Sequence, residues 1–303
     1  MPGQLTLLDA PSLWYRAFNG VPETLTSPDG LPVNAVRGFL DLLARIVRDT
    51  RPARLVAAVD LDWRPAFRVA AVPSYKAHRT TEGGAEAEPA SLGPQVEVLL
   101  EVLRALGVAV AGAEGYEADD VLGTLATREP GPVDVVTGDR DLFQLVRDDQ
   151  PVRVLYTVEK MRPYGEAEVA ARFGIPGRSY ADYAVLRGDP SDGLPGVKGI
   201  GDKTAAALVT RFGSVEAVLE ALDAGGADGF PAGARNRLAA ARDYLAVAPA
   251  VTRVVRDLPV PPLDDALPRH PRDPAAVVAL SDRWGLDSPL ERLLAALEVA
   301  YSG

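Results

Sequence analysis

The sequence predicts an α/β protein with a doubly wound, mostly parallel sheet, followed by a mainly helical C-terminal region. Three short apolar runs end on or beside an acidic residue, as buried parallel strands do, and they span residues 5–9, 55–60 and 133–139. Amphipathic stretches with helical spacing lie between them, at residues 33–49, 95–106 and 118–128. This alternation of strands and helices indicates a parallel sheet with helices on its faces.

After about residue 164 the strand signals fade, and short helical segments separated by glycine and proline turns take over. We therefore expect two parts, an α/β core at residues 1–163 and a helical region at residues 164–303. Within the core, residues 80–94 lack periodicity and are rich in glycine, proline and small side chains. That stretch is predicted to be a loop or arch.

The composition is that of a folded protein, with 303 residues of which 47% are hydrophobic and 24% charged. The absence of cysteine excludes a disulfide framework and a thiolate nucleophile, and the two histidines argue against a Ser-His-Asp triad. No apolar run reaches the roughly 18 residues of a membrane span, and no signal peptide opens the chain. We therefore expect a monomeric cytoplasmic protein without a membrane partner.

Acidic residues dominate the charge, with 42 Asp and Glu against 32 Lys and Arg and a formal net charge of −10. Taken alone, this balance argues against a nucleic-acid-binding protein, whose surface is usually basic. The positions of the charges matter more than their sum, however. Carboxylates are the most abundant chemically useful side chains here, and their natural partner is a hard divalent cation.

Three of the acidic residues follow predicted strands: Asp9, Asp60 and Asp139. The carboxyl ends of parallel strands meet at one edge of a sheet, where the sites of such proteins lie, so these side chains should converge there. The sequence from Val59 to Asp62 leaves open whether Asp60 or Asp62 is the converging residue.

Six further acidic residues stand at expected helix starts or turns: Glu117, Asp119, Asp120, Asp141, Asp189 and Asp192. Each alone is explained as a helix cap, a dipole contact or an Asx turn. All nine carboxylates together favour metal binding, because clustered charges repel one another strongly without cations. Two Mg²⁺ ions, for which Mn²⁺ could substitute, would suit phosphodiester hydrolysis without histidine or cysteine.

Two basic stretches point to nucleic acid. Residues 64–81 contain no acid, and Lys76 and Arg79 would share a helical face beside Tyr75, which could stack on a base. The turn at residues 194–205 places glycines and lysines before an apolar helix, a pattern suited to backbone contact with duplex DNA. Its candidate DNA-binding residues are Gly196, Lys198, Gly199, Gly201, Lys203 and Thr204. A solvated helix end and a plain turn are the structural alternatives.

Five ordered motifs carry a family resemblance: Leu7 to Ala10 with Tyr15 to Phe18, Tyr75 to Arg79, Gly115 to Leu122, Thr137 to Leu142, and Gly188 to Ala205. On these motifs the chain resembles the 5′→3′ exonuclease/flap endonuclease family, which includes the amino-terminal nuclease domain of bacterial DNA polymerase I. The resemblance implies a PIN-like core, a helical arch at about residues 74–94 and a helix–three-turn–helix DNA-binding element at about residues 193–212. No polymerase part follows, which implies a stand-alone nuclease.

The resemblance also implies roles for single residues. One metal would be held by Asp9, Asp60, Glu117 and Asp119, and a second by Asp139, Asp141 and Asp192, with Asp120 and Asp189 in the outer shell. The scissile phosphate would be gripped by Arg16, Lys76 and Arg79.

The implied reaction is Mg²⁺-dependent hydrolysis of DNA at 5′ ends, flaps or nicks, in replication and repair at the nucleoid. An RNA–DNA hybrid is left open as a second substrate. The alternative from another class is a non-catalytic module that recognises branched DNA.

Two departures from the family pattern lead to further expectations. Gly193 stands where many relatives have asparagine, which predicts a looser turn after Asp192. The arch carries Glu82, Glu86 and Glu88 and little positive charge, which predicts weaker or differently gated threading of a 5′ single strand.

Overall fold

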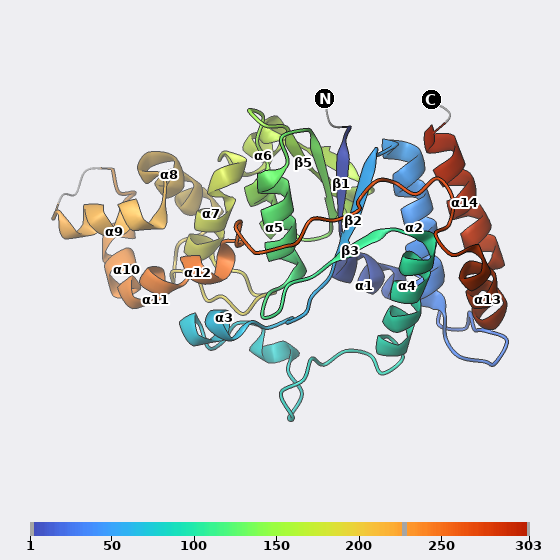
Figure 1. Cartoon of the computed structure of the whole chain (residues 1–303). Helices are drawn as coiled ribbons and strands as arrows, with labels where there is room; N and C mark the ends of the chain where they lie inside the picture. Colours follow the sequence, from blue (N-terminus) through green and yellow to red (C-terminus); the bar gives the residue numbers. More distant parts are fainter. Residues whose placement is uncertain (1–2, 226–228, 302–303) are drawn as a thin grey trace.

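The computed structural model describes residues 3–225 and 229–301, and Figure 1 shows a twisted sheet with helices on both faces. Within the described residues the sheet has six strands: β1 (Leu5–Asp9), β2 (Arg54–Ala58), β3 (Ala109–Ala111), β4 (Val133–Thr137), β5 (Val152–Tyr156) and β6 (Arg162–Tyr164). Their order is β3-β2-β1-β4-β5-β6, parallel except for β6, which is antiparallel to β5. The predicted α/β class is confirmed.

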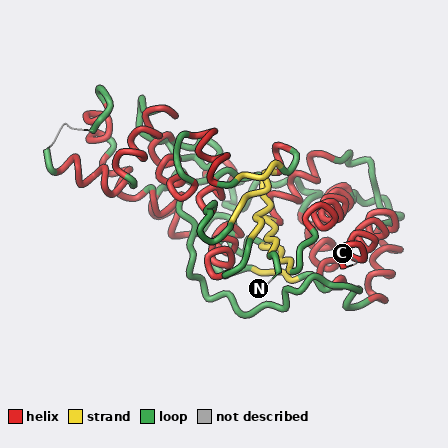
Figure 2. Tube along the Cα trace, turned by 90° about the horizontal axis from the view of Figure 1, so that it is seen from above, coloured by secondary structure: helices red, strands yellow, loops and turns green. Residues whose placement is uncertain are grey.

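Both faces of the sheet are covered, which explains why the strands are continuous apolar runs. Successive residues of β1 point to opposite faces: Leu7 belongs to a core that includes α5 (Ala118–Arg128), and Leu8 to a second core. The second core includes α1 (Ala10–Gly20), α2 (Asn34–Thr50) and α4 (Gly93–Leu106). Seen from above in Figure 2, the strands lie between these two groups of helices.

The helical region lies to one side of the sheet, at the left of Figure 1. It contains α6 (Glu166–Phe173), α7 (Tyr180–Arg187), α8 (Asp202–Phe212), α9 (Val215–Asp223), α10 (Ala234–Ala240), α11 (Arg242–Val247) and α12 (Pro249–Thr252). The short helix α3 (Ala66–Ala71) from the first half of the chain packs against α12. The residues predicted to contact DNA lie in the turns between α7 and α8 and in the first turn of α8.

The last two helices, α13 (Pro274–Trp284) and α14 (Asp287–Tyr301), return to the α/β core and pack on α4 and α2 (Figure 1). Leu290 and Leu293 of α14 are buried together with Phe39 and Leu43 of α2. The expectation of one helical region at residues 164–303 therefore needs correction. The apolar stripe of α14 finds its complement on α2, not on the helices that precede it in sequence.

The arch at residues 74–94 is not helical in the sense expected from the family. Within this fully described segment, the turn η1 (Ala77–Arg79) is a single 3₁₀ turn, and α4 begins at Gly93. Thr80 pairs with Glu86 in a small antiparallel bridge around Gly84, whose φ of +83° lies in the left-handed region that favours glycine. Without an apolar stripe to bury, these residues gain no packing energy from a helix.

Candidate active site

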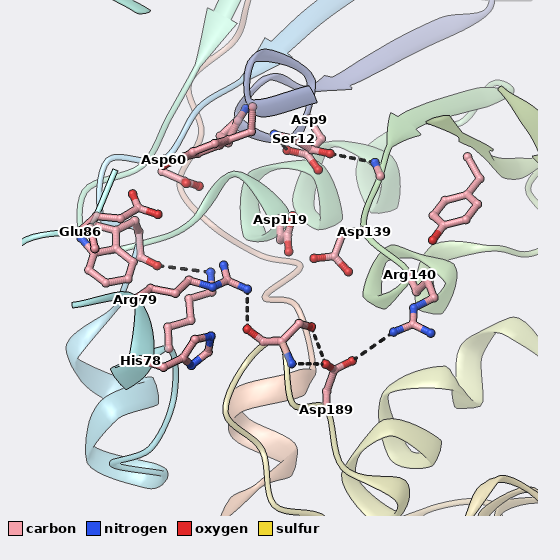
Figure 3. Close-up of a pocket in the computed structure, with 18 residues that line it drawn as sticks. Asp9, Ser12, Asp60, His78, Arg79, Glu86, Asp119, Asp139, Arg140 and Asp189 are labelled. Carbon is pink, nitrogen blue, oxygen red and sulfur yellow. Dashed lines mark hydrogen bonds and ion pairs between the residues drawn. The ribbon is translucent and has the colours of Figure 1, made fainter. Parts of the chain in front are cut away.

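The strand order reverses between β1 and β4, and a cavity of about 730 Å³ opens beyond the carboxyl ends of these strands (Figure 3). Five of the nine predicted carboxylates line it: Asp9, Asp60, Asp119, Asp139 and Asp189. They come from β1, from the segments that follow β2, β4 and α7, and from the first turn of α5. Residues far apart in sequence thus meet at one edge of the sheet.

Asp9 and Asp60 are positioned by hydrogen bonds to neighbouring elements. Asp9 ends β1 and caps α1, since its Oδ1 accepts from the backbone N–H of Ser12 at 3.1 Å. Asp60 Oδ1 accepts from the backbone N–H of Ala118 at 2.6 Å, which fixes it beside the start of α5. Asp62 accepts instead from the N–H of Arg64 and is not among the cavity-lining residues. Asp60 is therefore the converging residue.

Glu117 lies behind the cavity and is only 3% exposed. Its carboxylate accepts from three side chains, Arg68, Tyr75 and Lys76, with the Tyr75 hydroxyl at 2.7 Å. Tyr75 is itself only 3% exposed, so the prediction that its ring stacks on a base is wrong. Its hydroxyl is used to hold Glu117, and its ring packs in the core.

Asp120 points into the protein and not into the cavity. It accepts two hydrogen bonds from Arg68, at 2.9 Å and 2.7 Å, and one from the backbone N–H of Val255 at 2.8 Å. Its side chain is fully buried. Nothing in this geometry supports the outer-shell metal role that the resemblance implied, because its oxygens already have partners.

Arg68 was not singled out by the sequence reasoning. The side chain is 2% exposed, bridges Glu117 and Asp120, and donates from Nε to the carbonyl of Val251 at 3.0 Å. It thereby joins α3, α5 and α12. Arginine is almost never fully buried unless paired, so only the positions of its partners could have revealed it.

Asp141 and Asp192 are not among the residues that line the cavity. The backbone N–H of Asp141 donates to Asp139 Oδ1 at 2.8 Å, and a 3₁₀ helix, η2 (Asp141–Leu145), starts there. Asp139 and Asp141 therefore lie in a turn. Asp141 Oδ1 is buried without a hydrogen-bond partner among the described residues. Asp192 Oδ1 accepts from Arg79 at 3.2 Å.

Burial and mutual repulsion raise the pKa of these carboxyl groups. Desolvation, with added repulsion from Asp139 and Asp60, raises the pKa of Asp9 to about 7. The pKa of Asp60 and that of Asp192 both rise to about 6, again chiefly through burial. For Asp119 and Asp141 the pKa is raised well above its usual range by burial and then by Asp139. The cluster is short of positive charge.

The donor set fits a hard divalent cation, because it consists of oxygens and includes the unpartnered Oδ1 of Asp141. As the side chains stand, however, no three acidic or histidine residues within 3–225 and 229–301 are arranged to hold one ion together. A metal would therefore have to draw the carboxylates closer.

Cationic side chains flank the acids. Lys76 and Arg79 both line the cavity, and Arg79 also donates to the carbonyl of Ser191. Desolvation lowers the pKa of Lys76, but Glu117, Asp192 and Asp119 together raise it by more, so the ammonium group stays charged. Arg16 is exposed and lines a neighbouring cavity that shares Ser12 with the first. The cavity also contains side chains that the sequence reasoning did not select: Tyr15, His78, Glu86, Arg140 and Tyr156.

Asp189 forms the Asx turn expected of its sequence context and also lines the cavity. Its Oδ1 accepts from the backbone N–H of Ser191 at 2.9 Å, which makes an Asx turn, and the carboxylate still lines the cavity. The turn that follows is tight and not looser as expected, because a Cβ on Gly193 would lie 2.2 Å from the backbone oxygen of Ser74. This contact locks the base of the arch against the helical region.

The glycine-rich turn presents its lysines to solvent. Lys198, Gly199, Gly201 and Lys203 are exposed and Thr204 is half-buried, while apolar residues anchor the turn from below. Gly196 serves packing instead, since a Cβ there would lie 2.5 Å from backbone atoms of Arg187 at the end of α7. The turn thus has an exposed basic face held close to α7.

Comparison with known proteins places the chain in a family. The family model described as "5'-3' exonuclease, N-terminal resolvase-like domain" matches residues 4–174, and "5'-3' exonuclease, C-terminal SAM fold" matches residues 175–275. A Streptomyces coelicolor protein named 5'-3' exonuclease is 54% identical over 299 residues, covering 96% of this chain and 99% of the relative. The chain belongs to the 5'-3' exonuclease family. It is a nuclease, and the alternative of a non-catalytic DNA-binding module is set aside.

The same family includes longer proteins. DNA polymerase I of Mycobacterium tuberculosis is 38% identical over 303 residues, which cover 98% of this chain but only 32% of the polymerase. Among solved structures, the bacteriophage T5 D15 flap endonuclease in complex with DNA and metal ions has a TM-score of 0.63 at 18% identity. It covers 98% of this chain and 99% of its own, and so shows the same fold. In the described part of this chain, every helix is too short or too polar to cross a membrane.

Proposed function

We propose that this 5'-3' exonuclease family member is a Mg²⁺-dependent, structure-selective nuclease that hydrolyses DNA at 5′ ends, flaps or nicks and acts in replication and repair. We further propose that it works as a monomer in the cytoplasm. The observation that carries the proposal is the convergence of five carboxylates from five segments on one cavity, beside Lys76 and Arg79. A cavity with both signs of charge suits a metal ion and a phosphate together.

We propose that one divalent ion is held by Asp9, Asp60, Glu117 and Asp119, and a second by Asp139, Asp141 and Asp192, with Asp189 in the outer shell. Asp120 is removed from the set because Arg68 and backbone N–H groups use its oxygens. When bound, such ions would lower the pKa of a bound water and stabilise charge on the attacking and leaving oxygens. Their charge would also relieve the repulsion that raises the pKa of Asp9 and Asp60.

The chain's own cations would position the DNA. Lys76 and Arg79 stand at the cavity, where they can neutralise the phosphate that is cut. Arg16 lies in the adjoining cavity and would contact the next part of the strand. The exposed face of the turn with Lys198 and Lys203 would hold the duplex through backbone contacts that carry no sequence information.

A cleavage assay tests the proposal. A 5′-labelled flap duplex, a nicked duplex and an RNA–DNA hybrid are each incubated with Mg²⁺, with EDTA, and with the variant Asp139→Ala. We expect cutting of the DNA substrates that requires Mg²⁺ and is lost in Asp139→Ala. Cutting that persists in the variant or in EDTA would refute the metal assignment, and tight binding without any cutting would refute the hydrolytic function.

A further inference from the structure

A further cavity, of about 510 Å³ and distinct from the one that Arg16 lines, adjoins the candidate active site on the side of the helical region. Its lining includes four cationic side chains, Arg140, Arg172, Arg187 and Lys203, and one acidic side chain, Asp202. We call it the cationic pocket. The chain as a whole has a formal net charge of −10. Such a local excess of positive charge marks a place for an anion.

Arg140 connects the two cavities, because its side chain lines both. Its Nη2 lies 3.9 Å from Oδ2 of Asp189, and Figure 3 shows the guanidinium directed toward that carboxylate. A partly exposed ion pair at this distance is weak, so Arg140 keeps donors for a ligand. The cationic pocket is therefore continuous with the site where we propose the chemistry takes place.

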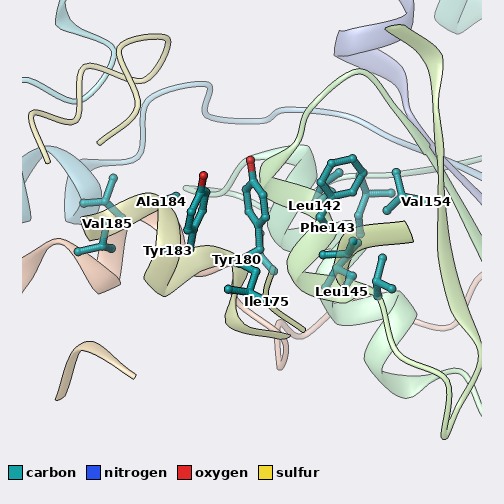
Figure 4. Close-up of a cluster of buried hydrophobic side chains, with 14 of the residues drawn as sticks. Leu142, Phe143, Leu145, Val154, Ile175, Tyr180, Tyr183, Ala184 and Val185 are labelled. Carbon is teal, nitrogen blue, oxygen red and sulfur yellow. The ribbon is translucent and has the colours of Figure 1, made fainter. Parts of the chain in front are cut away.

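Aromatic rings hold two of the arginines in place. The guanidinium carbon of Arg172 lies 5.4 Å from the ring centroid of Phe173, and that of Arg187 lies 5.5 Å from the centroid of Tyr183. Tyr183 in turn packs against Tyr180 in the buried cluster that Figure 4 shows. Side chains that are ordered before binding lose less entropy when a ligand arrives.

Guanidinium groups offer several donors in one plane, which match the oxygens of a phosphate group better than any neutral ligand. The cationic pocket lies between the candidate active site and the first turn of α8, where Lys203 stands. Its phosphate would therefore come from the DNA strand. We propose that the cationic pocket binds a phosphate of the DNA, either an internal linkage or the 5′-terminal group. This rests on the proposed function and adds Arg140, Arg172 and Arg187 to the DNA-contacting surface.

Binding without cleavage tests the inference. Flap duplexes with one neutral methylphosphonate linkage at successive positions, each with and without a 5′-phosphate, are titrated in EDTA and followed by fluorescence anisotropy. The affinity of the wild type for the duplex should fall about tenfold when one particular phosphate is neutralised or omitted, as expected for the loss of one charge-assisted contact. Arg172→Gln should bind the unmodified duplex about tenfold more weakly than the wild type does. Its affinity should not fall further when that same phosphate is neutralised or omitted, but should fall as in the wild type when any other phosphate is changed.

Arg140→Gln is the second variant, because Arg172 also pairs with Glu159 and its loss could perturb the fold. The matched control is Arg45→Gln, an exposed arginine of α2 that should bind as the wild type does. If the variants no longer bind more weakly when the 5′-phosphate is omitted, the terminal group is the ligand. If they instead no longer bind more weakly when one inner linkage is a methylphosphonate, the ligand is that phosphodiester. If both variants lose as much affinity as the wild type for every modified phosphate, the inference is overturned. A wild type that fails to cut flaps with Mg²⁺ would instead refute the proposed function.

Discussion

Replacing Arg68 with methionine should destabilise the fold, because this side chain supplies a cation to two buried carboxylates. The exposed fractions of the Arg68, Glu117 and Asp120 side chains are 2%, 4% and 0%. Desolvation by itself lowers the pKa of Arg68, but Glu117, Tyr75 and Asp120 raise it by more, so the guanidinium stays charged. Methionine keeps an apolar stem in the same space and leaves both carboxylates without their shared partner.

Of the two carboxylates, Asp120 would lose more hydrogen bonds than Glu117. It accepts from Arg68 Nη1 at 2.9 Å and Nη2 at 2.7 Å, and would keep only its backbone donors, such as Val255 N–H at 2.8 Å. Glu117 would keep Tyr75 and Lys76. Removing one partner of a buried ion pair costs about 3–5 kcal/mol. For a chain of 303 residues, that loss corresponds to a fall in Tm of about 5–8 °C.

Urea unfolding in EDTA, followed by circular dichroism, measures the difference in the free energy of unfolding. Arg45→Met is the control, since its pair with Asp49 is 47% and 46% exposed and should contribute at most about 1 kcal/mol. The double variant Arg68→Met/Asp120→Asn should recover part of the loss, because it removes one of the two unpaired charges. If Arg68→Met alone loses less than about 1 kcal/mol, the pair is worth no more than an exposed one and the reasoning fails.

Three other predictions concern the site and its surroundings. The pKa of Asp9 is raised from 3.8 to about 7, so its contribution to stability is present below pH 4 and is lost as the pH rises through 7. In EDTA at pH 8, Asp9→Asn should therefore unfold at a higher temperature than the wild type, and identical pH dependence of the two chains would contradict this. Gly193→Ala should lower Tm, because its Cβ would lie 2.2 Å from a backbone oxygen of the arch, whereas Gly20→Ala, with open space around it, should lose far less. Lys198→Ala/Lys203→Ala should reduce the slope of log K against log salt by about two for duplex DNA, and an unchanged slope would remove the turn from the contact surface.

The fold class and most of the carboxylates could be predicted from the sequence because their signals are local. A buried parallel strand is a short apolar run, and its end is marked by the next polar residue, so Asp9, Asp60 and Asp139 could be placed at one edge of the sheet before any coordinates were known. The short strands β3 and β6, of three residues each, carried no such signal. Neither did the return of α14 to α2, which depends on two amphipathic surfaces separated by more than 200 residues of chain.

By itself, the sequence determined which residue types stand at the ends of the strands and hence the chemistry that this edge of the sheet can support. Only the tertiary structure decided how each of these side chains is used. Asp60 faces the cavity and Asp62 does not, Asp120 is paired with Arg68, and Tyr75 is buried against Glu117. The physical reason is that a carboxylate's role depends on which donors reach it, and those donors come from segments that only folding brings together.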